Sequence, residues 1–166
     1  MMGAGKSSVG RCLERRTGLR RFDTDEMVSA RLDRSISDIF STLGEDEFRR
    51  AETEALASLT PMPSAIIVTG GGIVLRSENI EHLKRLGVVV WLEADEDILF
   101  ERAARRGNRP LLATDDPRTT LAKILAERTP LYTKAADIRL NTADRGHEEV
   151  TDLILAEIEN RTVPVT

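Results

Sequence analysis

The first ten residues of the chain, MMGAGKSSVG, combine the residue types that bind phosphate groups. A P-loop has a glycine, four variable residues, and then Gly-Lys-Ser or Gly-Lys-Thr, and Gly5, Lys6 and Ser7 supply its last three positions. Glycines let backbone N–H groups approach phosphates, and a helix that begins near Lys6 directs the positive end of its dipole at them. The alternative is a glycine-rich turn that leads into a capped helix. The predicted nucleotide-binding residues are Gly3, Ala4, Gly5, Lys6, Ser7 and Ser8, with Lys6 on the β- and γ-phosphates and Ser7 on Mg²⁺.

The opening glycine of this pattern would fall one residue before Met1. A P-loop normally follows a buried strand in the middle of a parallel sheet, and no residues precede this one to form that strand. We therefore expect the natural protein to start upstream, with Met1 as an internal methionine, so that the chain is truncated by one strand. A genomic reading frame that continues in phase through an apolar segment ending in glycine would support this expectation.

Two carboxylates follow in the segment Phe22-Asp23-Thr24-Asp25, where a short second strand would end. They lie on alternate positions at the carboxyl edge of the sheet, where ligands bind in α/β proteins. One can hold Mg²⁺ while the other accepts a hydrogen bond from a hydroxyl group that attacks phosphorus. An Asx turn or a helix N-cap would use the same residues, because Asp-Thr-Asp-Glu is also a good helix start.

Three further features suit an anionic acceptor substrate. Arg49 lies four residues after Glu45 and three before Glu52, so two acids on its own helix can hold its guanidinium rigid. Gly70, Gly71 and Gly72 follow an apolar strand, and their free N–H groups suit a close ligand. Arg128 falls on the apolar stripe of its helix, where a cation is costly unless it meets an anion. The alternatives are surface ion pairs for Arg49, a flexible turn for the three glycines, and an Arg128 side chain that snorkels to the surface.

The elements that would position these residues alternate along the chain. Short apolar runs at 65–69, 88–92 and 137–140 are typical of strands, and amphipathic segments with helical periodicity fill the intervals. This alternation predicts an α/β fold with a parallel sheet covered by helices on both faces. Asp116 and Pro117 mark a helix start after a loop that runs from residue 108 to residue 115.

Composition narrows the class of protein. The chain has 166 residues, of which 40% are hydrophobic and 31% charged, and a net charge of −4, which fits one globular domain over 1–166. Acids are interspersed among the arginines, so we expect no nucleic-acid partner, and no apolar run is long enough to span a membrane. We expect a cytoplasmic monomer. Cys12 is expected to be a buried thiol, and His82 and His147 are expected to lie apart on charged helices without a catalytic role.

The motifs MGAGKS, FDTDE, GEDEFRRAE, TGGGIVL, RPLL and ERTPLY, in this order, resemble the shikimate kinase family over essentially the whole chain. The resemblance implies a P-loop NTPase-like three-layer α/β/α fold with strand order 2-3-1-4-5, from which this chain lacks strand 1. It also implies transfer of the γ-phosphoryl group of ATP, with Mg²⁺, to the 3-hydroxyl of shikimate.

Site residues follow from the same resemblance. It implies that Asp23 belongs to the Mg²⁺ network and that Asp25 binds the shikimate hydroxyls and acts as base. Arg49 and Arg128 would bind the carboxylate, Gly71 and Gly72 would offer backbone contacts, and Phe40 and Phe48 would pack around the ring. Arg109 would lie in a lid over about residues 108–118 that closes on ATP, and Arg102 would stack on adenine. Two alternatives stay open, namely a non-catalytic ligand-sensing domain of a regulator and a P-loop kinase for another small hydroxy acid.

Overall fold

The computed structural model describes residues 1–60, 64–105 and 110–162, and it contains four short strands that pair in parallel. Strand β1 (Arg21–Asp23) pairs with β2 (Ile66–Val68), and β3 (Val90–Glu93) pairs with β4 (Ile138–Asn141). In register, Asp23 lies beside Val68 and Glu93 lies beside Asn141. The predicted α/β class with parallel strands is confirmed, and all three predicted apolar strands form within a few residues of their expected bounds.

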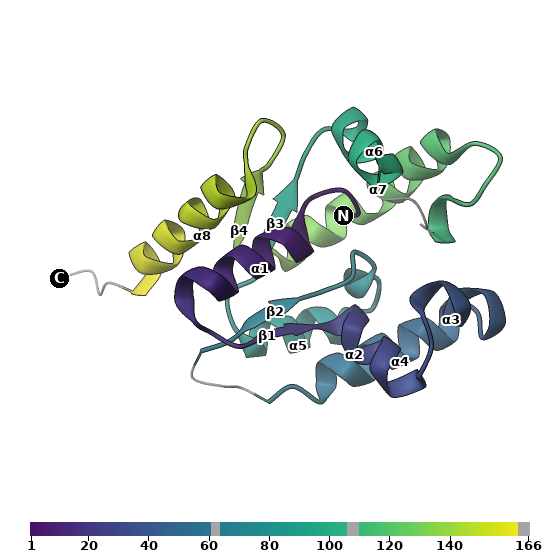
Figure 1. Ribbon diagram of the computed structural model, residues 1–166, viewed down its shortest axis with the longest axis horizontal. Coiled ribbons are helices and arrows are strands. Elements are labelled where there is room, and N and C mark those ends of the chain that lie inside the picture. The colour runs from purple at the N-terminus through teal and green to yellow at the C-terminus, as the bar shows by residue number, and fades with distance from the viewer. Residues whose placement is uncertain (61–63, 106–109, 163–166) are drawn as a thin grey trace.

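Helices connect and cover these strands (Figure 1). Their bounds are α1 (Lys6–Thr17), α2 (Thr24–Leu32), α3 (Ile36–Thr42), α4 (Glu45–Ala57), α5 (Ser77–Leu86), α6 (Glu96–Arg105), α7 (Pro117–Ala135) and α8 (His147–Thr162), with 3₁₀ turns η1 (Ile73–Leu75) and η2 (Pro110–Leu112). The predicted start of α7 is confirmed, because the Asp116 carboxylate caps the Thr119 N–H and Pro117 is the first helical residue.

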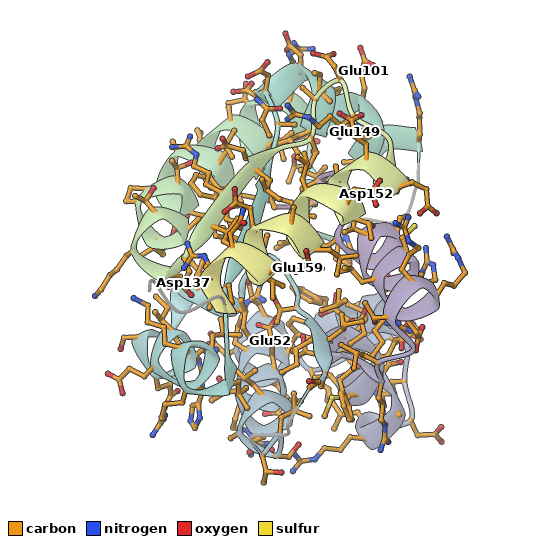
Figure 2. The ribbon with its side chains drawn as sticks, turned by 90° about the vertical axis from the view of Figure 1, so that its left-hand side faces the viewer. Glu52, Glu101, Asp137, Glu149, Asp152 and Glu159 are labelled. Atoms are coloured by element: carbon orange, nitrogen blue, oxygen red, sulfur yellow. The ribbon has the colours of Figure 1, made fainter. Side chains whose placement is uncertain are left out.

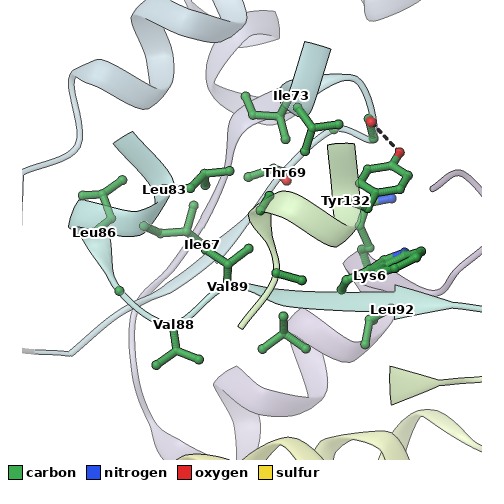
Figure 3. Close-up of a pocket in the computed structure, with 18 of the residues that line it drawn as sticks. Lys6, Ile67, Thr69, Ile73, Leu83, Leu86, Val88, Val89, Leu92 and Tyr132 are labelled. Carbon is green, nitrogen blue, oxygen red and sulfur yellow. Dashed lines mark hydrogen bonds between the residues drawn. The ribbon is translucent and has the colours of Figure 1, made fainter. Parts of the chain in front are cut away.

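The strands form two separate pairs rather than one sheet. Within the described ranges, no strand pairs with both β2 and β3, so each of these strands has one edge without a ladder partner. A mostly apolar cavity of about 180 Å³ lies between them, and Ile67, Leu83, Leu86, Val88 and Leu92 are among the residues that line it (Figure 3). The pairing order β1-β2 and β3-β4 is the order 2-3-1-4-5 with the central strand left out.

Buried apolar residues from both halves form the core. The main cluster includes Val9 of α1, Leu56 of α4, Trp91 of β3, Leu121 of α7 and Ile154 of α8. Cys12 is buried, as expected. The outer side of α8 is acidic, and Figure 2 shows Glu149, Asp152 and Glu159 along it. Helix α8 packs against α1, and at the edge of this contact Asp152 pairs with Arg16 of α1 at 2.6 Å.

No described helix is long and apolar enough to cross a membrane.

Candidate functional site

The phosphate loop has the backbone shape that its glycines predict. Gly3 and Gly5 adopt positive φ angles of 77° and 89°, which side-chain-bearing residues rarely do. A Cβ atom at Gly3 would collide with the backbone carbonyl oxygen of Leu99, so only glycine fits there. Helix α1 begins at Lys6 directly after the loop, and the Lys6 ammonium donates a hydrogen bond of 2.7 Å to the carbonyl oxygen of Met1. The loop and the helix start therefore form a concave group of donors that suits phosphate.

His147 lies against this loop, where the sequence did not lead us to expect it. A Cβ atom built on Gly5 would lie 3.4 Å from Cδ2 and 3.5 Å from Nε2 of the His147 imidazole. His147 is exposed at the start of the charged helix α8, as expected, but α8 starts beside the loop and so brings the imidazole near Gly5. Only the tertiary packing of α8 on α1 brings them together.

Asp23 and Asp25 lie where β1 ends and α2 begins. The Asp23 carboxylate caps α2 by accepting a hydrogen bond of 3.1 Å from the Asp25 N–H, so the N-cap interpretation holds for Asp23. Asp23 is buried, and burial together with the charges of Asp25 and Glu26 raises the pKa of its carboxyl. Its Oδ2 atom lies 3.3 Å from Nη1 of Arg21, so one cation already stabilises the charged carboxylate. The N-cap role and a place in a cation site are therefore compatible.

Arg49 is held by two acids of α4, as the sequence predicts. Its Nε and Nη2 donate to Glu45 Oε1 at 3.1 and 2.9 Å, and its Nη1 donates to Glu52 Oε2 at 2.9 Å. The guanidinium carbon lies 5.1 Å from the ring centroid of Phe48 and 5.9 Å from that of Phe40, within cation–π range. Arg49 is thus a rigid cation with aromatic rings beside it.

Glu52 is fully buried, and its second carboxylate oxygen, Oε1, has no hydrogen-bond partner among the described residues. Burial raises the pKa of Glu52, while Arg49 lowers it. A Cβ atom on Gly70 would lie 2.5 Å from Glu52 Oε1 and 2.8 Å from Asp25 Oδ1, so Gly70 is the point where the two acids approach each other. A side chain at position 70 would therefore have to displace one or both carboxylates.

Arg128 enters the same region from α7. Its side chain is buried, and its Nε atom has no hydrogen-bond partner in the part of the chain that the structure describes. A buried guanidinium with an unused N–H is costly unless an anion completes it. The carbonyl oxygen of Gly71 accepts a hydrogen bond from Tyr132, one helical turn after Arg128.

One cavity joins the two halves of the predicted site. It is lined by Gly3, Gly5, Lys6 and Ser7 of the phosphate loop, by Asp23 and Asp25, and by Phe40, Phe48, Arg49, Gly71, Gly72 and Arg128. Pro110 and Leu111 of η2, which belong to the lid predicted over about residues 108–118, also line it. Residues separated by more than a hundred positions in the sequence thus surround one cavity of about 130 Å³.

The other predicted residues lie elsewhere or are not described. Arg102 lines a neighbouring cavity with Ala4, Thr142 and His147, and its guanidinium donates to Thr142 and to the carbonyl oxygen of Ala143. Ser8 lines neither of these two cavities. Arg109 and the first part of the predicted lid, residues 108 and 109, lie outside the described residues.

The hydrogen-bond donors and oxygen ligands of this cavity fit a nucleoside triphosphate and Mg²⁺. The loop offers N–H groups and Lys6, and the Ser7 hydroxyl and the Asp23 carboxylate are hard oxygen ligands that line the same cavity. No group of three or more His, Cys, Asp or Glu side chains among the described residues could hold a metal ion.

Residues 2–159 match the family model described as shikimate kinase. The chain belongs to the shikimate kinase family. It is 42% identical over 163 residues to a shikimate kinase of Symbiobacterium thermophilum, a match that covers 97% of this chain and 94% of the relative. It is 41% identical to a shikimate kinase of Thermodesulfovibrio yellowstonii over 95% of this chain and 91% of that one.

Solved structures give the same result for the fold. Shikimate kinase from Acinetobacter baumannii in complex with shikimate superimposes with a TM-score of 0.93 and 34% sequence identity, over 98% of this chain and 91% of that chain. Shikimate kinase from Aquifex aeolicus superimposes with a TM-score of 0.80 and 32% identity. The elements of this chain therefore superimpose on the fold of the family.

Proposed function

We propose that this chain transfers the γ-phosphoryl group of ATP to the 3-hydroxyl of shikimate and so forms shikimate 3-phosphate. The observation that carries the proposal is one cavity in which two buried arginines, from α4 and α7, lie near a phosphate loop and a pair of carboxylates. Family membership and the relatives' names support the same reaction.

The two ends of the cavity bind different parts of the reactants. Arg49 and Arg128 bind the acceptor carboxylate, Phe40 and Phe48 pack on its ring, and Gly71 and Gly72 offer backbone N–H groups. Lys6 and the loop hold the phosphates, and Ser7 and Asp23 hold Mg²⁺. Mg²⁺ neutralises charge on the phosphates when it is bound.

Asp25 takes the hydroxyl proton as the acceptor oxygen attacks phosphorus, and Lys6 and Arg109 stabilise the charge that develops on the transferred group. Catalysis by this chain is then chiefly positioning and electrostatic stabilisation, because the transfer needs no covalent intermediate with the protein. Arg102 stacks on the nucleobase, and residues 108–118 close over the nucleotide. We expect a monomer in the cytoplasm that acts without nucleic acid.

A coupled assay of ADP release tests the proposal. We expect release that depends on both shikimate and Mg²⁺, and none with an uncharged ester of shikimate at the same concentration. Two arginines that each contribute about 1.5–3 kcal/mol through charge-assisted hydrogen bonds would discriminate against the ester by a factor of at least about 10². Binding of shikimate without ADP release would favour the ligand-sensing alternative, and turnover of a different hydroxy acid in preference to shikimate would favour another acceptor.

A further inference from the structure

Tyr132 ties the glycine loop to helix α7. Its hydroxyl donates a hydrogen bond of 2.6 Å to the carbonyl oxygen of Gly71, which Figure 3 shows as a dashed line. The Met1 sulfur, at 3.7 Å, is a second and weaker acceptor. The Tyr132 ring is buried and packs on Trp91 with the ring centroids 5.5 Å apart, so the hydroxyl is held in place by the core.

This hydrogen bond fixes more than the carbonyl group. The Gly71–Gly72 peptide is trans and planar, so the Gly72 N–H points away from the Gly71 carbonyl oxygen. Holding the oxygen toward Tyr132 therefore directs the Gly72 N–H to the opposite side. No described backbone carbonyl accepts a hydrogen bond from the Gly71 or the Gly72 N–H, and both glycines line the cavity that holds the two arginines.

Gly72 also touches the first arginine of the site. A Cβ atom at Gly72 would collide with the guanidinium group of Arg49, so that guanidinium packs directly on this peptide. The second arginine, Arg128, lies on α7 four residues before Tyr132, and both side chains are buried. The Tyr132 hydroxyl thus links the helix that carries Arg128 to the loop on which the Arg49 guanidinium packs.

We propose that Tyr132 is a positioning residue for the acceptor: its hydroxyl orients the Gly71–Gly72 peptide so that the Gly72 N–H and both arginines converge on the acceptor's carboxylate. The proposal rests on the proposed function, because it assigns a residue to the acceptor half of that site. Tyr132 acts through the loop and takes no part in phosphoryl transfer.

The test is Tyr132→Phe, which removes one oxygen atom and keeps the ring that packs on Trp91. We expect the KM for shikimate to rise about 3- to 10-fold, as for the loss of one neutral hydrogen bond. The kcat and the KM for ATP should stay within about twofold of the parent, because the nucleotide half does not depend on this contact.

Thr133→Val is the matched control, since it also removes a hydroxyl from α7. That hydroxyl is exposed and donates to the Thr129 carbonyl oxygen of its own helix, and it does not line the site. This control should leave both KM values unchanged. An unchanged KM for shikimate in Tyr132→Phe would overturn the role of Tyr132. So would a rise of both KM values by similar factors together with a fall in thermal stability. A parent chain without shikimate-dependent ADP release would instead overturn the proposed function itself, so the two failures are distinguishable.

Discussion

Arg128→Met separates binding from stability more cleanly than any other change in the site. Arg128 is a buried cation whose Nε has no partner among the described residues, and Coulomb repulsion from it helps lower the pKa of the Met1 amino group. Methionine has a similar length, favours helices and brings no charge to be desolvated. We therefore expect the free protein to lose little from the substitution.

The substitution should affect the free energy of unfolding and the affinity for shikimate differently. The free energy of unfolding should stay within about 1 kcal/mol of the parent or increase, because replacing a buried charge with an apolar side chain is often neutral or stabilising. Affinity for shikimate should fall about 10- to 150-fold, which corresponds to one charge-assisted hydrogen bond of about 1.5–3 kcal/mol. Urea unfolding measures the first quantity, and calorimetric titration with shikimate measures the second.

Arg85→Met is the control, because Arg85 is an exposed arginine on α5 and does not line the site. It should change neither quantity, and ATP binding should be the same in both variants. Shikimate affinity retained by Arg128→Met would refute the reasoning, since the buried guanidinium would then have no anion to bind. A stability loss of several kcal/mol would also refute it, because Arg128 would then be satisfied within the protein.

Three other predictions concern single groups. Asp25→Asn should abolish turnover and change the melting temperature little, as thermal unfolding and the ADP assay would show; normal turnover would mean that Asp25 only supports the start of α2. Gly70→Ala should lower the free energy of unfolding by about 1–3 kcal/mol, because its Cβ would meet Glu52 and Asp25. Gly146→Ala should leave the free energy of unfolding unchanged, because no atom of the described residues lies within 4 Å of the new Cβ. An equal loss of stability in the two variants would contradict the crowding at Gly70. In a chain produced with Met1 as its first residue, burial, Lys6 and Arg128 lower the pKa of the Met1 amino group from its usual value of 8.0, so the unfolded chain binds more protons just below pH 8 and stability should rise with pH up to about 8. Unfolding at several pH values measures this slope, which N-terminal acetylation should remove; an acetylated chain with the same slope would assign it to other groups.

The sequence predicted the local features because each depends on neighbours in the chain. The glycines at positions 3 and 5, the cap at Asp116 and the pairing of Arg49 with Glu45 and Glu52 all involve residues at most four positions apart. Backbone conformation and helical spacing decide such contacts before any tertiary packing exists. The phosphate loop and the rigid Arg49 could therefore be predicted directly.

Tertiary structure alone decided how these local features combine. Only folding brings the His147 imidazole beside Gly5, and only folding directs the Tyr132 hydroxyl at Gly71. Likewise, Asp25 and Glu52 approach each other across Gly70 because β1 pairs with β2 while α4 packs on α2. Such contacts join residues dozens of positions apart, and their geometry depends on the packing of whole helices, which no local pattern encodes.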